Sequence, residues 1–482
     1  MRLTTTTRWR TLAAVSLVGM VTLGLAGGPG QAAVTATDWS GYEHGPAHSS
    51  AAFTDLAIST TTVGTLHPLW TFKPAAATLG GQPGPKIDAS PTVVGNTVYL
   101  AARTGVIYAL DATTGSVIWQ RLLDYGSRTL CSAKGIVGTP TVAPDPVSGV
   151  LTVYAVGAHY LYALAAGTGA QIWRTSIGPD TPDGDARYFN WSSPTVLGGR
   201  IFLGVGANCE ADLVRGGVVS VDQHTGATLA TYDAVPSGAV GASVWSSVAA
   251  AGSSVWVTTG NPDPTGSQVY DSYSIVRLAA ATLAKQDKYT VPLSLTQDLD
   301  FGSSPTLFNA AVGGVSTSLV AACNKNGMLY AWRQTDLAAG PVWSRQVGGG
   351  PTYGSGLCIT SPAYDGPAKR LLVAAVAASV GGVSGRGVIL SLAPGTGAVQ
   401  WQRSLPCAPV GSPTLNATTH VLAVPLFSCP AGVVAGVRLY DETSGTLLRT
   451  LPTAGPVFAQ PVFAGGRLYV AGESGGLTAY AP

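Results

Sequence analysis

Apolar residues alternate with polar or small residues along most of this chain, and glycine-containing turns interrupt the alternation at regular intervals. Segments 90–119 (SPTVVGNTVYLAARTGVIYALDATTGSVIW) and 139–173 (TPTVAPDPVSGVLTVYAVGAHYLYALAAGTGAQIW) share one layout. Each begins with a Ser-Pro or Thr-Pro pair, contains three apolar stretches and a turn of the form (D/A)xxTG, and ends in tryptophan. Alternation with a period of two residues between such turns predicts four antiparallel β-strands in each segment.

The proline that opens each segment recurs along the chain. It stands at positions 91, 140, 194, 305, 413 and 461, so the steps are 49, 54, 111, 108 and 48 residues. Each of the two long steps contains two units, one that begins near Val244 without the proline and one that begins near Pro362. Eight units of about 50 residues, each with four strands, predict an all-β fold, an eight-bladed β-propeller.

The eighth unit lacks its last strand, because the chain ends soon after Tyr480. Leu66–Phe72 (LHPLWTF) has the character of the missing strand, so we expect it to complete the last blade and to close the ring. This gives an extended N-terminal arm at 34–65 and a propeller at 66–482. Five tryptophans at equivalent positions are then expected to pack between blades: Trp70, Trp119, Trp173, Trp343 and Trp401.

The first 33 residues have the pattern of a secretory signal peptide. Three arginines precede the apolar stretch Leu12–Leu25, and small residues follow at Ala32 and Ala33. We therefore expect a secreted, extracellular protein. The apolar stretch is shorter than the roughly 20 residues that span a bilayer, and we expect no membrane span.

Composition narrows the classes of partner. Hydrophobic residues make up 46% of the chain and charged residues 10%, which disfavours disorder. Removing the three arginines of the signal peptide changes the net charge from +2 to −1. We therefore expect neither nucleic acid nor an anionic membrane as a partner.

Six cysteines remain in the chain after the signal peptide. An even number in an exported protein predicts disulfides. Sequence neighbours become spatial neighbours in a repeat fold, so we expect the pairs Cys131–Cys209, Cys323–Cys358 and Cys407–Cys429. Buried free thiols are the alternative. No CxxC or CxxCH motif is present, so the sequence contains no thiol-redox, zinc-ribbon or covalent haem signature.

The repeat resembles the pyrroloquinoline-quinone (PQQ) propeller family. The resemblance rests on the phrases YALDATTGSVIW, YALAAGTGAQIW and VVSVDQHTGATL, and on the arm from Trp39 to Phe72. It covers nearly all of the chain after the signal peptide. It implies the propeller fold but does not by itself imply activity, because non-catalytic members share the repeat.

Motifs in the middle blades are more specific. Quinoprotein alcohol dehydrogenases hold Ca²⁺ beside the quinone with a glutamate, an asparagine and an aspartate. In this chain GVGANCEADLVRGGVVSVDQHTG places Glu210 at the glutamate, and TTGNP places Asn261 at the asparagine. Trp245 precedes the TTGNP strand, and the resemblance implies that it forms the floor beneath the quinone ring.

Two further residues are implied by the same resemblance. QDLDFGSS places Asp300 at the catalytic aspartate, which also belongs to the metal site, although Leu299 replaces the usual tryptophan before it. NKNGMLY places Lys325 at the cation that contacts the quinone. Gly302 stands where lanthanide-using relatives carry a second aspartate, which favours calcium.

Ordinary chemistry supports these assignments. Ca²⁺ binds six to eight oxygens, which carboxylates and an amide carbonyl supply. A carboxylate near a substrate hydroxyl can take its proton, and a cation near the quinone oxygens stabilises the charge that develops there. Each residue also has a purely structural alternative: Asn-Pro and Asn-Gly are common turn pairs, acids cap turns, and tryptophan packs between blades.

Two functions follow from the sequence. The first is an exported dehydrogenase, dependent on PQQ and Ca²⁺, that oxidises a small-molecule or polymeric alcohol, as the similar polyvinyl alcohol dehydrogenases do. It would pass electrons to a separate acceptor, because the chain has no haem domain. The second is a non-catalytic propeller that binds other proteins outside the cell. The absence of the family's vicinal cysteine pair favours the second: Cys131 is followed by Ser132.

Overall fold

The computed structural model describes residues 33–75, 86–123, 135–178, 187–207, 213–265, 268–293, 298–349, 358–377, 379–474 and 476–482. Residues 1–32 of the expected signal peptide lie outside this part of the chain. Glu210, Cys131 and Cys209 also lie outside the described residues.

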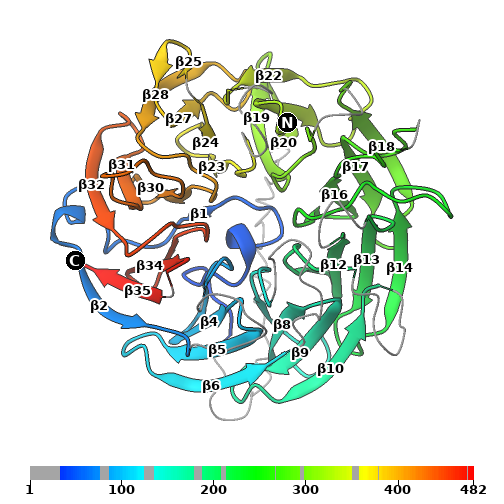
Figure 1. Ribbon diagram of the computed structural model, residues 1–482, viewed down its shortest axis with the longest axis horizontal. Helices are drawn as coiled ribbons and strands as arrows, with labels where there is room; N and C mark the ends of the chain where they lie inside the picture. Colours follow the sequence, from blue (N-terminus) through cyan, green and yellow to red (C-terminus); the bar gives the residue numbers. More distant parts are fainter. Residues whose placement is uncertain are drawn as a thin grey trace, which may run out of the picture. The chain divides into compact units, whose positions relative to one another are not determined.

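Eight antiparallel sheets of four strands surround a central axis, as the repeat predicts (Figure 1). In each sheet the first strand lies nearest the axis. Blades 1 to 4 consist of β3 (Thr92–Val94), β4 (Thr97–Ala101), β5 (Val106–Asp111) and β6 (Val117–Leu122); β7 (Thr141–Pro144), β8 (Leu151–Gly157), β9 (Tyr160–Ala165) and β10 (Gln171–Ser176); β11 (Thr195–Leu197), β12 (Arg200–Val205), β13 (Gly217–Asp222) and β14 (Thr228–Asp233); and β15 (Ala249–Ala251), β16 (Ser254–Thr258), β17 (Ser274–Ala279) and β18 (Lys285–Thr290).

Blades 5 to 8 consist of β19 (Thr306–Val312), β20 (Val315–Cys323), β21 (Met328–Arg333) and β22 (Trp343–Gln346); β23 (Ala363–Asp365), β24 (Arg370–Val376), β27 (Gly387–Leu392) and β28 (Val399–Leu405); β29 (Thr414–Asn416), β30 (Val421–Leu426), β31 (Gly436–Asp441) and β32 (Leu447–Pro452); and β33 (Val462–Ala464), β34 (Arg467–Gly472), β35 (Gly476–Ala481) and β2 (His67–Phe72). A small hairpin, β25 (Ser379–Val380) and β26 (Val383–Ser384), extends from blade 6. The described helices are single 3₁₀ turns, η1 (Tyr42–His44) and η2 (Val63–Thr65).

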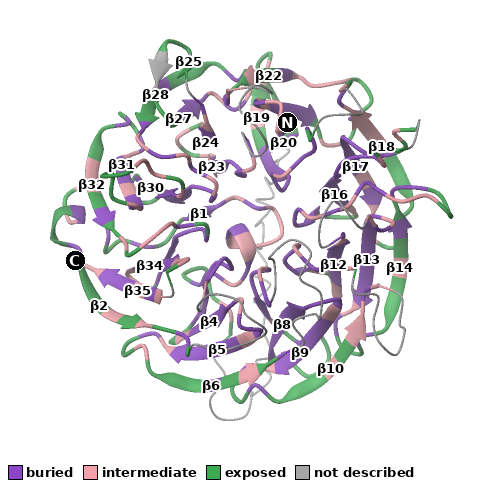
Figure 2. Ribbon diagram, in the orientation of Figure 1, coloured by how far each residue is buried: buried purple, intermediate pink, exposed green. Residues whose placement is uncertain are grey.

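The predicted ring closure is confirmed. β2 pairs antiparallel with β35, with Pro68 opposite Tyr480, so the N-terminal strand is the outer strand of the last blade. Figure 2 shows the inner strands mostly buried, whereas the outer strands β6, β10, β14 and β32 expose one face. Closure leaves no blade with a missing strand.

The tryptophans pack between blades as expected. The indole Nε1 of Trp119 donates to the Ala166 carbonyl of the next blade at 2.8 Å. Gly169 of that blade has a φ of +68° and lies against the Trp119 ring, so that a Cβ there would come within 2.5 Å of the indole. The other four tryptophans face an equivalent glycine: Trp70–Gly115, Trp173–Gly226, Trp343–Gly397 and Trp401–Gly445. The glycine of each of these turns, which has no side chain, therefore leaves the space that the tryptophan of the preceding blade fills.

A ring of hydrogen bonds joins the blades around the axis. In seven of the eight blades, the residue before the start of the inner strand donates its backbone N–H to the side-chain hydroxyl of the equivalent residue in the next blade. The Ser193 amide, for example, donates to Ser247 Oγ at 2.9 Å. These bonds run in order through Ser90, Thr139, Ser193, Ser247, Ser304, Ser361 and Ser412, and from Gln460 back to Ser90.

The N-terminal arm crosses the middle of the propeller. Its backbone forms hydrogen bonds with the inner strands of six blades, and β1 (Ala51–Ala52) adds to blade 7 in parallel with β29. The contacts in chain order are Trp39–Val93, Ser40–Val142, Pro46–Ala250, Ala47–Leu307, Ser49–Tyr364 and Ser50–Leu415. The arm therefore holds η1 near the axis, where its side chains reach the central cavity.

Two of the predicted disulfides are confirmed. Cys323–Cys358 connects the end of β20 to the segment that enters blade 6, and Cys407–Cys429 connects the end of β28 to the loop after β30. The predicted Cys131–Cys209 pair lies outside the described residues. Within the described part of the chain, no helix has both the length and the apolar character to cross a bilayer.

Candidate active site

Asp300 lies at the centre of a polar cluster where the chain enters blade 5. Its carboxylate is 1% exposed and accepts a hydrogen bond from Trp245 Nε1 at 2.8 Å through Oδ2. Its other oxygen, Oδ1, lies 2.6 Å from Lys325 Nζ. The Lys325 backbone N–H also donates to the Asp300 carbonyl at 3.0 Å, which fixes the β20–β21 turn against this segment.

Asp298 connects Lys325 to Asn261. Its Oδ1 accepts from Lys325 Nζ at 2.7 Å and from Asn261 Nδ2 at 2.9 Å. Because the two polar atoms of an amide diverge, this bond turns the Asn261 carbonyl oxygen away from Asp298. Asn261 comes from the loop after β16, so residues from blades 4 and 5 meet at this point.

Lys325 is held as a cation. Burial alone would lower the pKa of Lys325, but the carboxylates of Asp300 and Asp298 outweigh that effect and raise the pKa above its usual value. The same interaction acts on Asp298, where burial would raise the pKa and Lys325 lowers it below its usual value. Lys325 Nζ also lies 5.1 Å from the centroid of the Trp245 ring, within range of a cation–π contact.

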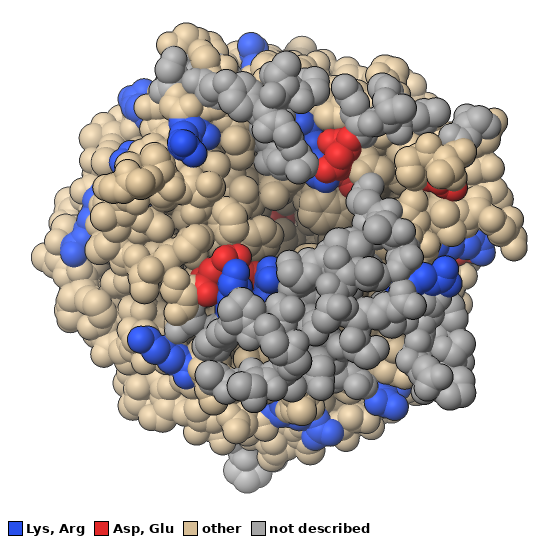
Figure 3. Space-filling view, viewed as in Figure 1, with Lys and Arg blue, Asp and Glu red and all other residues tan. Residues whose placement is uncertain are grey.

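Trp245 connects this cluster to a central pocket. The pocket encloses about 820 Å³, including its open mouth, and Trp245 and Gly302 both line it. A Cβ at Gly302 would lie 2.6 Å from Trp245 Cη2 and 2.6 Å from Ile359 Cγ2, so the ring occupies the space that any larger residue at 302 would need. Figure 3 shows this face of the propeller hollowed near its middle.

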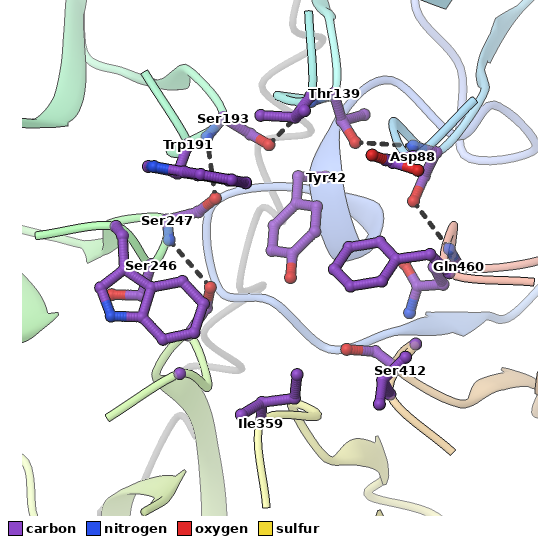
Figure 4. A pocket seen from close by; sticks show the side chains of 18 of the residues that line it. Tyr42, Asp88, Thr139, Trp191, Ser193, Ser246, Ser247, Ile359, Ser412 and Gln460 are labelled. Atoms are coloured by element: carbon purple, nitrogen blue, oxygen red, sulfur yellow. Dashed lines mark hydrogen bonds between the residues drawn. The ribbon is translucent and has the colours of Figure 1, made fainter. Parts of the chain in front are cut away.

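The rest of the pocket wall comes from the hydrogen-bonded ring and the arm. Figure 4 shows Ser193, Ser247, Ser412 and Gln460 around the cavity, with Tyr42 of η1 pointing into it. Beside Tyr42, the fully buried Glu43 accepts a hydrogen bond from Ser412 Oγ at 3.1 Å. Burial raises the pKa of Glu43 to about 8, so it is protonated at neutral pH.

A second cation lines the pocket from blade 1. Arg103, in the β4–β5 turn, forms an ion pair with the buried Asp88. Nearby, Lys86 Nζ lies 3.1 Å from Glu473 Oε2. The Asp88–Arg103 pair thus lies on the blade 1 side of a pocket whose wall elsewhere contains hydroxyl and aromatic side chains, Trp245 among them.

Four of the five residues singled out in the sequence converge here: Trp245, Asn261, Asp300 and Lys325. The fifth, Glu210, lies outside the described residues. The sequence interpretation missed Asp298, although it belongs to the same QDLDFGSS segment and stands two positions before Asp300. It also missed Arg103, whose signal was its position in a turn ending in glycine, as Lys325 is.

Comparison with known proteins identifies the family. Residues 39–372 match the model described as PQQ, the glucose/ethanol/alcohol dehydrogenase β-propeller domain. The chain belongs to this family. The match begins at Trp39 of the arm and extends into blade 6, so it contains all four clustered residues.

Curated relatives include two polyvinyl alcohol dehydrogenases. The protein from a Pseudomonas species is 26% identical over 317 residues, which cover 56% of this chain and 46% of the relative. The one from Sphingopyxis sp. (strain 113P3) is 26% identical over 332 residues, which cover 59% of this chain and 48% of the relative. The matched region thus spans just under half of each relative.

A solved structure shares the fold. The quinohaemoprotein alcohol dehydrogenase of Comamonas testosteroni superposes with a TM-score of 0.73 at 17% identity, covering 92% of this chain and 80% of that one. The likeness shows that the two chains share the propeller fold.

Proposed function

We propose that this protein is a PQQ-dependent dehydrogenase that oxidises an alcohol in its central pocket. The observation that carries the proposal is the contact network of Trp245, Asp300, Lys325, Asp298 and Asn261 beside that pocket. These residues come from blades 4 and 5 and from the segments before each, and their side chains contact one another at one place. A base, a cation, an aromatic face and oxygen donors are the groups that such chemistry requires.

The residues fit both parts of the cofactor. An aromatic ring at Trp245 and the adjacent pocket suit a planar quinone, and Lys325 and Arg103 suit its anionic oxygens. The carboxylate of Asp300 and the amide oxygen of Asn261 are hard donors of the kind Ca²⁺ prefers, and we propose Glu210 as a further ligand. Gly302 leaves no room beside Trp245 and Ile359 for an additional aspartate, which favours calcium over a lanthanide.

Bound PQQ would supply the acceptor for the two electrons and the hydrogen that leave the alcohol carbon. Asp300 takes the proton of the alcohol hydroxyl. Trp245 Nε1 and Lys325 Nζ contact its two oxygens and would hold the carboxylate in place for that transfer.

The substrate and the location of the protein are finer parts of the proposal. The relatives named as polyvinyl alcohol dehydrogenases favour a secondary or polymeric alcohol. The two disulfides favour an oxidising compartment outside the cytoplasm. We propose that a separate electron acceptor reoxidises the cofactor.

Dye-linked alcohol oxidation tests this function. Purified protein is incubated with PQQ and Ca²⁺, then given a secondary alcohol, a primary alcohol or polyvinyl alcohol with an artificial electron acceptor. We expect dye reduction that requires both PQQ and an alcohol. Binding of PQQ without dye reduction from any alcohol would favour the second hypothesis, a propeller without catalytic activity.

A further inference from the structure

A second cluster of ligand-type side chains lies at the opposite ends of the blades from Lys325. Asp365 ends β23, His420 lies in the β29–β30 turn and Glu442 follows β31. These turns are at the other end of the antiparallel strands from the β4–β5 and β20–β21 turns that carry Arg103 and Lys325. The cluster is therefore separate from the candidate active site.

The three side chains face one another across the boundary between blades 6 and 7. One ligand atom from each lies within 4.8 Å of the other two. His420 Nδ1 is 3.0 Å from Glu442 Oε2, and the Glu442 backbone N–H donates to the His420 carbonyl at 2.9 Å. Trp401 Nε1 donates to the Glu442 carbonyl at 2.8 Å, which anchors this residue to blade 6.

The two carboxylates are buried without a full set of partners. Asp365 is 1% exposed: its Oδ1 accepts from the Ala368 amide at 2.9 Å, but its Oδ2 has no hydrogen-bond partner among the described residues. Glu442 is fully buried, and its Oε1 also lacks a hydrogen bond. Buried carboxylate oxygens are normally hydrogen-bonded, ion-paired or bound to a metal.

Arg370 only partly balances this charge. Its Nε lies 3.8 Å from Glu442 Oε1, and its Nη1 is directed to Gln400 Oε1 at 3.1 Å. A cation between Asp365, His420 and Glu442 would engage the two carboxylate oxygens that lack a hydrogen bond.

We propose that Asp365, His420 and Glu442 bind a divalent transition-metal ion of the Zn²⁺ class. One imidazole nitrogen with two carboxylate oxygens suits Zn²⁺, whereas Ca²⁺ and Mg²⁺ prefer oxygen donors only. In a tetrahedral Zn²⁺ site, ligand atoms about 2.1 Å from the ion lie roughly 3.4 Å from one another, so the site closes by a movement of at most about 1.4 Å. The imidazole of His420 is half-exposed and has room for this movement. Water completes the coordination, and the ion joins blade 6 to blade 7.

The molecule contains a matched control. His224 Nδ1 lies 2.9 Å from Asp145 Oδ2, and His224 is about as exposed as His420. Among the described residues, no third ligand-type side chain joins this pair. His224 therefore reproduces the exposed imidazole–carboxylate contact without the complete donor set.

Titration calorimetry with ZnCl₂ on chelator-treated full-length protein tests the proposal. We expect wild type and His224→Asn to bind one Zn²⁺ with equal affinity, and His420→Asn to bind it at least tenfold more weakly. Asn is chosen because position 420 has a φ of +59°, which Asn tolerates. CaCl₂ at equal concentration should not compete.

A second variant guards against indirect effects. Asp365→Asn should also weaken Zn²⁺ binding at least tenfold, with unchanged circular dichroism. Wild-type protein that binds no Zn²⁺, or His420→Asn protein that binds it as wild type does, would overturn the proposal.

Discussion

The β20–β21 turn of blade 5 and the β4–β5 turn of blade 1 are the same structural unit on two sides of the central pocket. In each turn, the backbone N–H of a cationic residue donates at 3.0 Å to a backbone carbonyl, Lys325 to Asp300 and Arg103 to Lys86. The accepting residue stands four positions before the serine that belongs to the hydrogen-bonded ring, Ser304 or Ser90. In each, a glycine two residues after the cation closes the turn, through Gly327 and Gly105. The backbone of the repeat thus places two cations equivalently.

The side chains differ at two positions. Blade 5 has Asp300 where blade 1 has Lys86, and it has Gly302 where blade 1 has Asp88. The acid beside the cation therefore stands two positions earlier in blade 5 than in blade 1. In blade 5 the Trp245 ring occupies the space beside Gly302, where blade 1 has the Asp88 side chain. The repeat provides the frame, and a few departures from it produce one cluster with an acid, a cation and an aromatic ring together.

The largest expected effect is a difference in turnover between variants of Asp300 and Asp88. Asp300→Asn should lower turnover by roughly 10²–10⁴-fold because it removes the proton acceptor, while PQQ remains bound. Asp88→Asn, the acid of the opposite turn, should retain most of the turnover at saturating PQQ. Dye-linked kinetics of both variants measure this. Equal losses would mean that the two turns have equivalent roles, and the comparison would be wrong.

The next effect concerns the two cations. Lys325→Met leaves Asp300 and Asp298 without their partner and should cost about 2–4 kcal/mol of unfolding free energy. Arg103→Met should cost less, because Arg103 forms an ion pair with one carboxylate, that of Asp88, whereas Lys325 contacts two. Urea denaturation at pH 7 measures both. A larger loss for Arg103→Met would reverse the comparison.

The Lys325 contribution should also depend on pH in a defined direction. The pKa of Asp298 is below its usual 3.8 in the folded protein, so the stability from its ion pair is present above pH 3.8 and is lost as the pH falls through the folded-state pKa. The difference between wild type and Lys325→Met should therefore shrink in acid. A difference that grows below pH 3.8 would show that the ion pair is not its source.

The smallest expected effect is on stability and concerns Gly302. Gly302→Ala puts a methyl group 2.6 Å from Trp245 and Ile359, so the ring must move, at a cost of about 1–3 kcal/mol. Gly167→Ala, where nothing lies within 4 Å, should change stability by at most about 0.5 kcal/mol. Thermal unfolding and tryptophan fluorescence compare them. Identical behaviour of the two variants would mean that Trp245 does not need the space at 302.

The sequence predicted the features that repeat. The opening proline occurs in seven blades, the tryptophan in five and the (D/A)xxTG turn in four, and blade number and ring closure followed from the spacing of these units. Two disulfides followed from the pairing of neighbouring cysteines. The four described site residues came from resemblance to a family. Only their contacts required the structure, since they depend on how adjacent blades face each other.

The features that were missed depend on single positions. Asp298 stands two positions before Asp300 in the same segment, and nothing in the spacing of the repeat distinguishes it. The Asp365–His420–Glu442 cluster draws on two blades, and its residues share no motif. The course of the arm across six blades is set by backbone hydrogen bonds, which residue identity does not reveal.

Equilibrium binding of PQQ to the chelator-treated protein, with and without Ca²⁺, shows whether the pocket beside Trp245 is a quinone site. We expect one PQQ per chain, observed as a shifted quinone absorbance and quenched tryptophan fluorescence, with affinity that falls when Ca²⁺ is omitted and again in Asn261→Ala. Absence of stoichiometric PQQ binding in the presence of Ca²⁺ would contradict this expectation, and the pocket beside Trp245 would then not be a quinone site.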